Sequence, residues 1–153
     1  MALGLGTELR RLIDSLDRSI DQIYRNAGVD FRPRYYPYVQ LLAQSGERSV
    51  GEFASELGFT QPAVTQTLNL MLTSGLVERI ATADRRERRF RLSSEGRAIM
   101  GGLEPIWRAT ERAARRLEHD IGMDLTAAAS AALARLDQVP FARMIDEEMA
   151  GCA

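Results

Sequence analysis

The chain has 153 residues, of which 45% are hydrophobic, and a net charge of −1, which suits one compact unit or a small domain with appended helices. It contains one cysteine, Cys152, and one histidine, His119, so we expect no intrachain disulfide, no metal site and no cofactor. Because no apolar run approaches the roughly 18 residues that span a membrane, and charges interrupt the N-terminus too often for a signal peptide, we expect a cytoplasmic protein without membrane partners.

The first predicted element is an amphipathic helix of about five turns. Apolar residues recur at helical spacing from Leu9 to Ile23, Thr7 is placed to cap the start, and Gly28 is placed to stop the helix. An aromatic segment with two prolines follows. Within it, a second helix is predicted to begin near Tyr35, with a proline in its first turn.

Two short helices joined by a tight turn are predicted next, which is the pattern of a helix-turn-helix. The first has a capping box, formed by Ser49 and Glu52, and Gly58 at its end. The second is predicted to start at the Thr60 cap and to end at Gly75. The residues expected to face inward are Val50, Phe53, Ala54 and Leu57 in the first helix, and Ala63, Val64, Leu68, Met71 and Leu72 in the second.

A β-hairpin is predicted after the helix-turn-helix, because residues 76–81 and 88–93 read as strands on either side of a charged loop. Phe90 and Leu92 share one face of the second strand, and arginines occupy the other. A hairpin at this place is a wing. Residues 79–97 contain seven arginines and three acids, a net charge of 7 − 3 = +4.

The rest of the chain is predicted to be helical. A long helix begins at Ser93 or Ser94, and Pro105 is expected to kink it or to split it near the preceding Gly-Gly pair. A further helix with Thr126 as its cap and a last short helix after Pro140 complete the chain. The predicted fold class is therefore mainly α, a winged helix-turn-helix with N- and C-terminal helices.

The second helix of the helix-turn-helix carries polar side chains suited to reading base edges in a DNA major groove. Glutamine and asparagine can bond adenine through two hydrogen bonds, and a threonine methyl can contact thymine. Residues 60–75 contain no charge, so no arginine is present to read guanine. The alternative is an ordinary polar surface. The candidate DNA-binding residues are Thr60, Gln61, Pro62, Thr65, Gln66 and Asn69.

The predicted wing supplies positive charge near the hairpin tip. Arginines at the end of a ribbon can enter a minor groove, where narrow A·T segments concentrate negative potential. Asp84 can hold the guanidinium of Arg86 in place. The alternative is a solvated charged loop. The candidate wing residues are Asp84, Arg85, Arg86, Arg88 and Arg89.

Residues 49–99 resemble the winged helix-turn-helix of the MarR family of bacterial transcriptional regulators. The resemblance implies a homodimer on a palindromic DNA site, with Asp84 and Arg86 as the pair that shapes the wing. One departure is the absence of a basic residue near Gln66 or Asn69, so the preferred DNA sequence does not carry over. The matching residues are Thr60, Val64 and Thr65; Gly75, Leu76, Val77 and Arg79; Asp84 and Arg86; Leu92, Ser93 and Gly96.

Apolar stripes in the terminal helices support the homodimer, although packing within one chain is the alternative. We therefore expect an N-terminal dimerisation helix over residues 1–30, a DNA-binding winged domain over residues 31–97, and C-terminal dimerisation helices over residues 98–153. The expected function is that of a repressor that binds double-stranded DNA, and the protein is not expected to be an enzyme. The alternative function is a winged-helix module that binds protein rather than DNA.

The resemblance also implies a site for a small aromatic or anionic ligand that releases the protein from DNA. Aromatic residues cluster in sequence after the first helix, and two arginines among them could bind a carboxylate. The alternative is that the rings form hydrophobic core. The candidate residues are Phe31, Arg32, Arg34, Tyr35, Tyr36, Tyr38 and Trp107.

Overall fold

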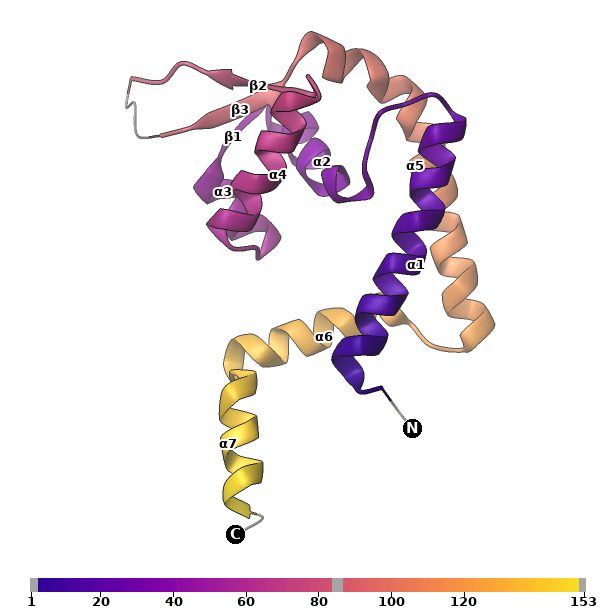
Figure 1. Ribbon diagram of the computed structural model, residues 1–153, viewed down its shortest axis with the longest axis vertical. Coiled ribbons are helices and arrows are strands. Elements are labelled where there is room, and N and C mark those ends of the chain that lie inside the picture. Colours follow the sequence, from indigo (N-terminus) through magenta and orange to yellow (C-terminus); the bar gives the residue numbers. More distant parts are fainter. Residues whose placement is uncertain (1–2, 84–86, 152–153) are drawn as a thin grey trace. The chain divides into compact units, whose positions relative to one another are not determined.

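The computed structural model describes residues 3–83 and 87–151. The chain is mainly helical with one small antiparallel sheet, which confirms the predicted fold class (Figure 1). None of the described helices combines the length and the hydropathy needed to cross a membrane. The elements in chain order are α1 (Leu5–Asn26), the short 3-10 helix η1 (Pro33–Tyr35), α2 (Tyr36–Ser45), β1 (Glu47–Ser49), α3 (Val50–Leu57), α4 (Gln61–Thr73), β2 (Val77–Ile80), β3 (Arg89–Leu92), α5 (Ser94–Ile121), α6 (Leu125–Gln138) and α7 (Phe141–Gly151).

The chain divides into two compact units, Met1–Trp107 and Arg108–Ala153, and helix α5 begins in the first and ends in the second. In the second unit no residue of α6 or α7 is buried. The first unit contains the hydrophobic core, to which α1, the segment after it, and α2 through the start of α5 contribute. Its fully buried side chains include Val39, Leu42, Phe53, Val64, Leu68, Met71, Phe90 and Leu103.

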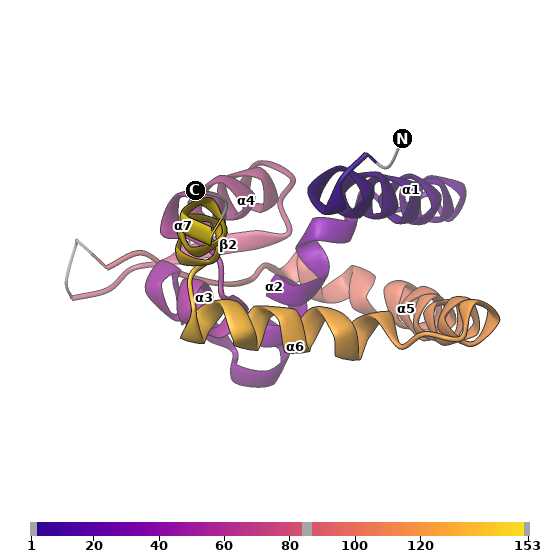
Figure 2. The same ribbon diagram turned by 90° about the horizontal axis from the view of Figure 1, so that it is seen from below.

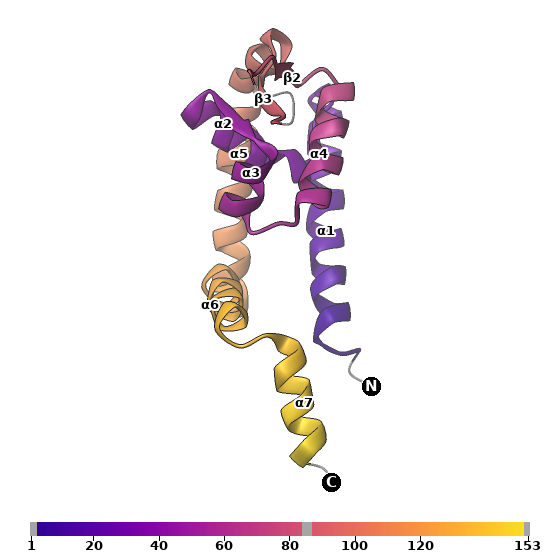
Figure 3. The same ribbon diagram turned by 90° about the vertical axis from the view of Figure 1, so that its left-hand side faces the viewer.

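The helix-turn-helix forms where the capping signals predicted it (Figure 3). The Ser49 hydroxyl accepts a hydrogen bond from the Glu52 backbone N–H at 3.2 Å, and the Glu52 carboxylate accepts one from the Ser49 N–H at 2.6 Å. Gly58 ends α3 with a left-handed backbone (φ +68°), and Thr60 caps α4. Ala63 was expected to face inward but is exposed, because the first three residues of α4 all lie outside the core.

The sheet has three strands in the order β1-β3-β2, whereas the sequence predicted two. Strands β2 and β3 form the predicted hairpin, with Val77 opposite Leu92. Strand β1 pairs with the other edge of β3 and places Glu47 opposite Arg91. Strand β1 has only three residues and ends at the helix cap Ser49, which is too short for an alternating pattern, so the sequence does not reveal it. The arms of the hairpin project beyond α3 and α4 (Figures 1 and 2).

A tight contact joins the start of α5 to the segment before β2. The Ser93 backbone N–H donates to the Leu76 carbonyl at 3.0 Å, and the Ser93 hydroxyl donates to the Gly75 carbonyl. The same hydroxyl accepts from the Gly96 N–H at 2.9 Å, so Ser93 caps α5. A Cβ atom at Gly96 would stand 2.1 Å from the Leu76 carbonyl oxygen. Only glycine therefore fits at position 96 without displacement of the backbone.

One prediction about helix α1 is wrong, and for helix α5 the structure excludes one of the two expected alternatives, the split. Helix α1 begins at Leu5 after Gly4 and has no side-chain cap, so Thr7 lies inside the helix. Helix α5 is not split at Gly101 and continues through Pro105. Pro105 has no backbone N–H to donate to the carbonyl of Gly101. Both residues are exposed, so water can solvate that carbonyl.

The predicted cap of α6 is also wrong. Asp124 caps this helix, because its carboxylate accepts a hydrogen bond from the Ala127 N–H at 2.7 Å. The backbone N–H and the hydroxyl of Thr126 both donate to the Glu118 carboxylate at 2.9 Å. Asp124 fits the cap position because its short side chain lies one residue before the first helical residue.

Candidate nucleic-acid interface

Helix α4 exposes an uncharged face over most of its length. Four of the predicted reading residues are exposed on it, and Thr65 is half-buried. Thr60 serves as the helix cap, since its hydroxyl accepts from the Ala63 N–H at 3.4 Å. The amide side chains on this face can donate and accept hydrogen bonds at base edges. The exposed predicted residues are Gln61, Pro62, Gln66 and Asn69.

The exposed face of α4 also includes residues that the sequence reading left out. Leu70 is 43% exposed, and Ala63 is exposed three residues before Gln66. Ala63, Gln66 and Leu70 recur at helical spacing, so they form one stripe with the amide at its centre. A helical wheel centred on Gln66 would have found this stripe, but the sequence pattern assigned Ala63 to the core and left Leu70 unassigned.

Part of the predicted wing lies outside the described residues, namely Asp84, Arg85 and Arg86. Arg88 is exposed, and its side chain makes no ion pair or hydrogen bond with any residue in the ranges 3–83 and 87–151. Its guanidinium can therefore contact a phosphate without first breaking a bond to those residues.

Arg89 is held by the protein itself. Its guanidinium forms ion pairs with Glu47, Glu52 and Glu87, and its side chain is 21% exposed. The hydrogen bond from the Ser49 backbone N–H, followed by the side-chain bond from Ser49 and the nearby positive charge of Arg89, lowers the pKa of Glu52 despite the opposing effect of burial. The structure thus separates Arg89 from Arg88, although the sequence treated them alike.

The aromatic residues of the predicted effector site do not all lie together. Phe31, Tyr35 and Trp107 are buried together, with the Phe31 ring centroid 5.7 Å from that of Tyr35 and 5.8 Å from that of Trp107. The ring of Tyr36 is exposed and lies edge-on to Trp107, with centroids 5.2 Å apart. Tyr38 is buried elsewhere, against Phe53.

The two arginines of the predicted effector site, Arg32 and Arg34, are exposed beside the buried rings in sequence. Tyr24, which was not predicted, completes the aromatic cluster: the Trp107 indole N–H donates to its hydroxyl at 3.0 Å. Burial raises the pKa of Tyr24 above its ordinary value. Among the described residues no cluster of His, Cys, Asp and Glu could hold a metal ion.

A capped helix-turn-helix followed by a short antiparallel sheet, with an uncharged exposed second helix, defines a winged helix-turn-helix protein. A family model described as MarR family matches residues 28–89. This match covers the winged helix-turn-helix region, so this part of the chain is similar to the MarR family. A search of curated proteins by sequence gives no match.

Solved structures share the fold of this chain. The M. tuberculosis transcriptional regulator MOSR in complex with DNA is 26% identical, with a TM-score of 0.63 over 84% of this chain and 98% of that one. The S. aureus MepR–DNA complex, at 18% identity, has a TM-score of 0.69 over 88% of this chain and 100% of that one. NadR in complex with 4-hydroxyphenylacetate, at 20% identity, has a TM-score of 0.57 over 91% of this chain and 97% of that one.

Proposed function

We propose that this chain is a cytoplasmic repressor that binds a palindromic operator as a homodimer and leaves it when a small ligand binds. The observation that carries the proposal is the exposed, uncharged face of α4, directly followed by the wing. Gln66 lies at the centre of this face, and Gln61 and Asn69 flank it with further amides. These side chains would read the major groove of one half-site in each subunit.

The wing would supply the sequence-independent attraction to DNA. Arg85, Arg86 and Arg88 would contact phosphates or the minor groove, with Asp84 bracing Arg86. Removing one phosphate contact from each subunit lowers the slope of log affinity against log salt by about 2 in a dimer. Arg86→Ala should therefore weaken binding to all DNA sequences and reduce this slope, as measured by fluorescence anisotropy at several salt concentrations. An unchanged slope would remove Arg86 from the interface.

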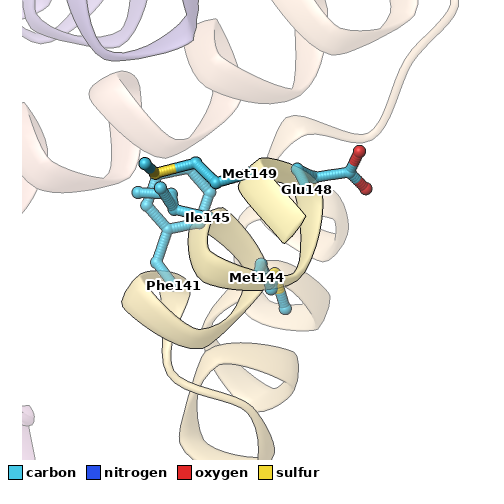
Figure 4. A pocket seen from close by; sticks show the side chains of 5 residues that line it. All are labelled: Phe141, Met144, Ile145, Glu148 and Met149. Carbon is cyan, nitrogen blue, oxygen red and sulfur yellow. The ribbon is translucent and has the colours of Figure 1, made fainter. Parts of the chain in front are cut away.

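Exposed apolar side chains on the terminal helices support the homodimer. In α1 these are Leu5, Leu9, Ile13, Leu16 and Ile23. In α7, Phe141, Ile145 and Met149 gather on one side of the helix, and the carboxylate of Glu148 points away from them (Figure 4). We propose that the helices within residues 1–30 and 98–153 bury these side chains against a second copy.

Sedimentation velocity tests the homodimer directly. The protein should sediment as a dimer, and Ile145→Asp, which places a charge on the apolar side of α7, should shift it towards monomer. Ala150 lies on the opposite side of the same helix by its position and is exposed, so Ala150→Asp is the matched control. A monomeric wild-type protein at micromolar concentration would refute the homodimer.

We further propose that the ligand is a small aromatic or anionic molecule that binds beside Tyr36, with Arg32 and Arg34 available to a carboxylate. One structural neighbour was solved with 4-hydroxyphenylacetate, which suggests phenolic acids as first probes. The single tryptophan, Trp107, lies against Tyr36, so its fluorescence reports on this region. A titration with 4-hydroxyphenylacetate should change that fluorescence and release bound DNA, and a flat titration excludes this probe.

The experiment that decides the function is sequencing of DNA that the purified protein selects from its own genome. Enrichment of a palindromic sequence supports an operator-binding dimer, and Gln66→Ala should then change the enriched half-site. Unchanged selection by Gln66→Ala would remove Gln66 as a reader of bases. Failure to retain any fragment at low salt would favour the other candidate, a module that binds protein.

A further inference from the structure

We propose that Arg89 is a positioning residue that fixes the wing to the start of α3, and that it does not contact DNA. This inference rests on the proposed function, because it concerns how the wing is held for binding. It assigns separate roles to two adjacent arginines, Arg88 and Arg89, that the sequence does not distinguish.

The guanidinium of Arg89 contacts carboxylates from three different segments. Its Nε atom lies 3.0 Å from Glu47 Oε1 in β1, and its Nη2 atom lies 3.3 Å from Glu52 Oε2 in α3. Its Nη1 atom lies 2.9 Å from Glu87 Oε1 at the end of the hairpin loop. Every nitrogen of the guanidinium therefore faces a carboxylate of the protein.

The contact with Glu52 connects Arg89 to the cap of α3. The same Glu52 oxygen, Oε2, accepts the 2.6 Å hydrogen bond from the Ser49 backbone N–H and lies 3.3 Å from the guanidinium of Arg89. Ser49 is also the residue opposite Arg89 in the ladder between β1 and β3. One carboxylate thus holds both the first turn of α3 and the side chain that projects from the hairpin.

The backbone ladder between β1 and β3 is short, so the side chain of Arg89 matters for the position of the hairpin. Strand β1 has three residues, and beyond them only the Val50 N–H continues the ladder, by donating to the Arg88 carbonyl at 3.3 Å. A three-residue ladder gives little resistance to rotation of the hairpin about its base. Arg89 adds two charge-assisted contacts across that base, to Glu47 and Glu52, and a third within the hairpin, to Glu87; together they set the direction in which the hairpin leaves the sheet.

Electrostatics also argues against a phosphate contact by Arg89. One positive charge among the three carboxylates of Glu47, Glu52 and Glu87 gives the cluster a net charge of 1 − 3 = −2. A phosphate that approached Arg89 would meet these carboxylates and would have to displace at least one of them. Arg88, which is exposed and forms no ion pair with the described residues, faces no such barrier from them.

The test compares Arg89→Met with Arg88→Met as the matched control, since methionine keeps the apolar part of the side chain and removes the charge. Two quantities are measured on a DNA fragment selected by the wild-type protein: affinity across a range of salt, and the mobility of a nitroxide label at position 83. The label is attached to Ala83→Cys in a Cys152→Ser background, so that it reports on the hairpin directly.

For Arg89→Met we expect the affinity for DNA to fall roughly tenfold at every salt concentration. A tenfold loss corresponds to about the free energy of one hydrogen bond to a charged group. The salt slope should stay the same, and the label should become more mobile. For Arg88→Met we expect the slope to fall by about 2 in a dimer, with no change in the label. Arg89→Lys should restore part of the label's immobility, because lysine can contact one or two of the carboxylates.

Two results would overturn the inference. If Arg89→Met lowers the slope as Arg88→Met does and leaves the label unchanged, Arg89 is a phosphate contact. If it changes neither affinity nor label, the cluster does not position the wing. If circular dichroism shows that Arg89→Met does not fold, Glu47→Gln replaces it. A positioning role for Arg89 predicts a more mobile label and no steeper salt slope. If Arg89 instead contacts DNA, removing the charge of Glu47 frees its guanidinium and the salt slope should become steeper.

The failure of the proposed function is distinguishable from the failure of this inference. If the wild-type protein binds no DNA fragment, the proposed function is wrong. The label mobility of Arg89→Met, measured without DNA, still shows whether Arg89 holds the hairpin, and an unchanged mobility would refute that role independently.

Discussion

Replacing Gly96 with alanine should destabilise the chain, although alanine favours helices. Gly96 is buried in the first turn of α5, and an added Cβ would stand 2.1 Å from the Leu76 carbonyl oxygen and 3.3 Å from the Ser93 hydroxyl. That carbonyl also accepts the 3.0 Å hydrogen bond from the Ser93 N–H. The new methyl group would therefore push α5 and the segment before β2 apart at a contact that both need.

The size of the effect follows from three terms. Forcing the added methyl group into a tight core contact lowers the free energy of unfolding by about 1–3 kcal/mol. Weakening of the hydrogen bond between Ser93 and Leu76 adds about 1 kcal/mol. The higher helix propensity of alanine offsets about 1 kcal/mol. The net loss in the free energy of unfolding should be about 1–3 kcal/mol.

Urea unfolding followed by far-ultraviolet circular dichroism measures this loss, at one fixed protein concentration because dimerisation would affect stability. Gly101→Ala is the matched control, since Gly101 lies in the same helix, is exposed, and has open space where the Cβ would be. It should gain about 0.5–1 kcal/mol. If Gly96→Ala were as stable as the wild type while Gly101→Ala showed its gain, the close contact would be refuted.

Two further changes in stability are expected. Tyr24→Phe leaves the buried Trp107 indole N–H without its acceptor and should lower the free energy of unfolding in urea by about 1–3 kcal/mol. Tyr36→Phe, at an exposed ring, should cause no measurable loss. Equal losses for the two variants would contradict the hydrogen bond. The pKa of Glu52 is lowered in the folded state, so its contribution to stability is present at neutral pH and is lost as the pH falls from about 4.5 through that lowered pKa. The deficit of Glu52→Gln relative to the wild type should therefore be largest at neutral pH and shrink in acid, and a deficit independent of pH would show that the charge of Glu52 contributes nothing.

The sequence predicted those parts of the fold that depend on neighbouring residues. The capping box of Ser49 and Glu52, the Thr60 cap and the end of α3 at Gly58 were all predicted correctly, because each depends on residues three or four positions apart. The hairpin followed from the alternation around Phe90. The cap of α6 was missed because Asp124 and Thr126 are both acceptable caps by type, and only the structure shows which one is engaged.

Features that depend on distant residues could not be predicted in this way. Arg89 and Glu47 are 42 positions apart, so nothing in the local sequence pattern indicated that Arg89 should be left out of the DNA-binding wing. The hydrogen bond between Tyr24 and Trp107 spans 83 positions. The exposure of Leu70 depends on which side of α4 the core covers, and the sequence pattern assigned Leu70 to neither side.

The absence of charge on α4 has a consequence for how the protein would respond to ionic strength. In the proposed arrangement, attraction to the phosphate backbone comes from the wing arginines, whereas discrimination between bases comes from uncharged side chains around Gln66. Only the first contribution releases counterions and weakens with salt. A rise in cellular salt would then weaken binding to operators and to non-specific sites by the same factor, and the ratio of the two affinities would survive the change.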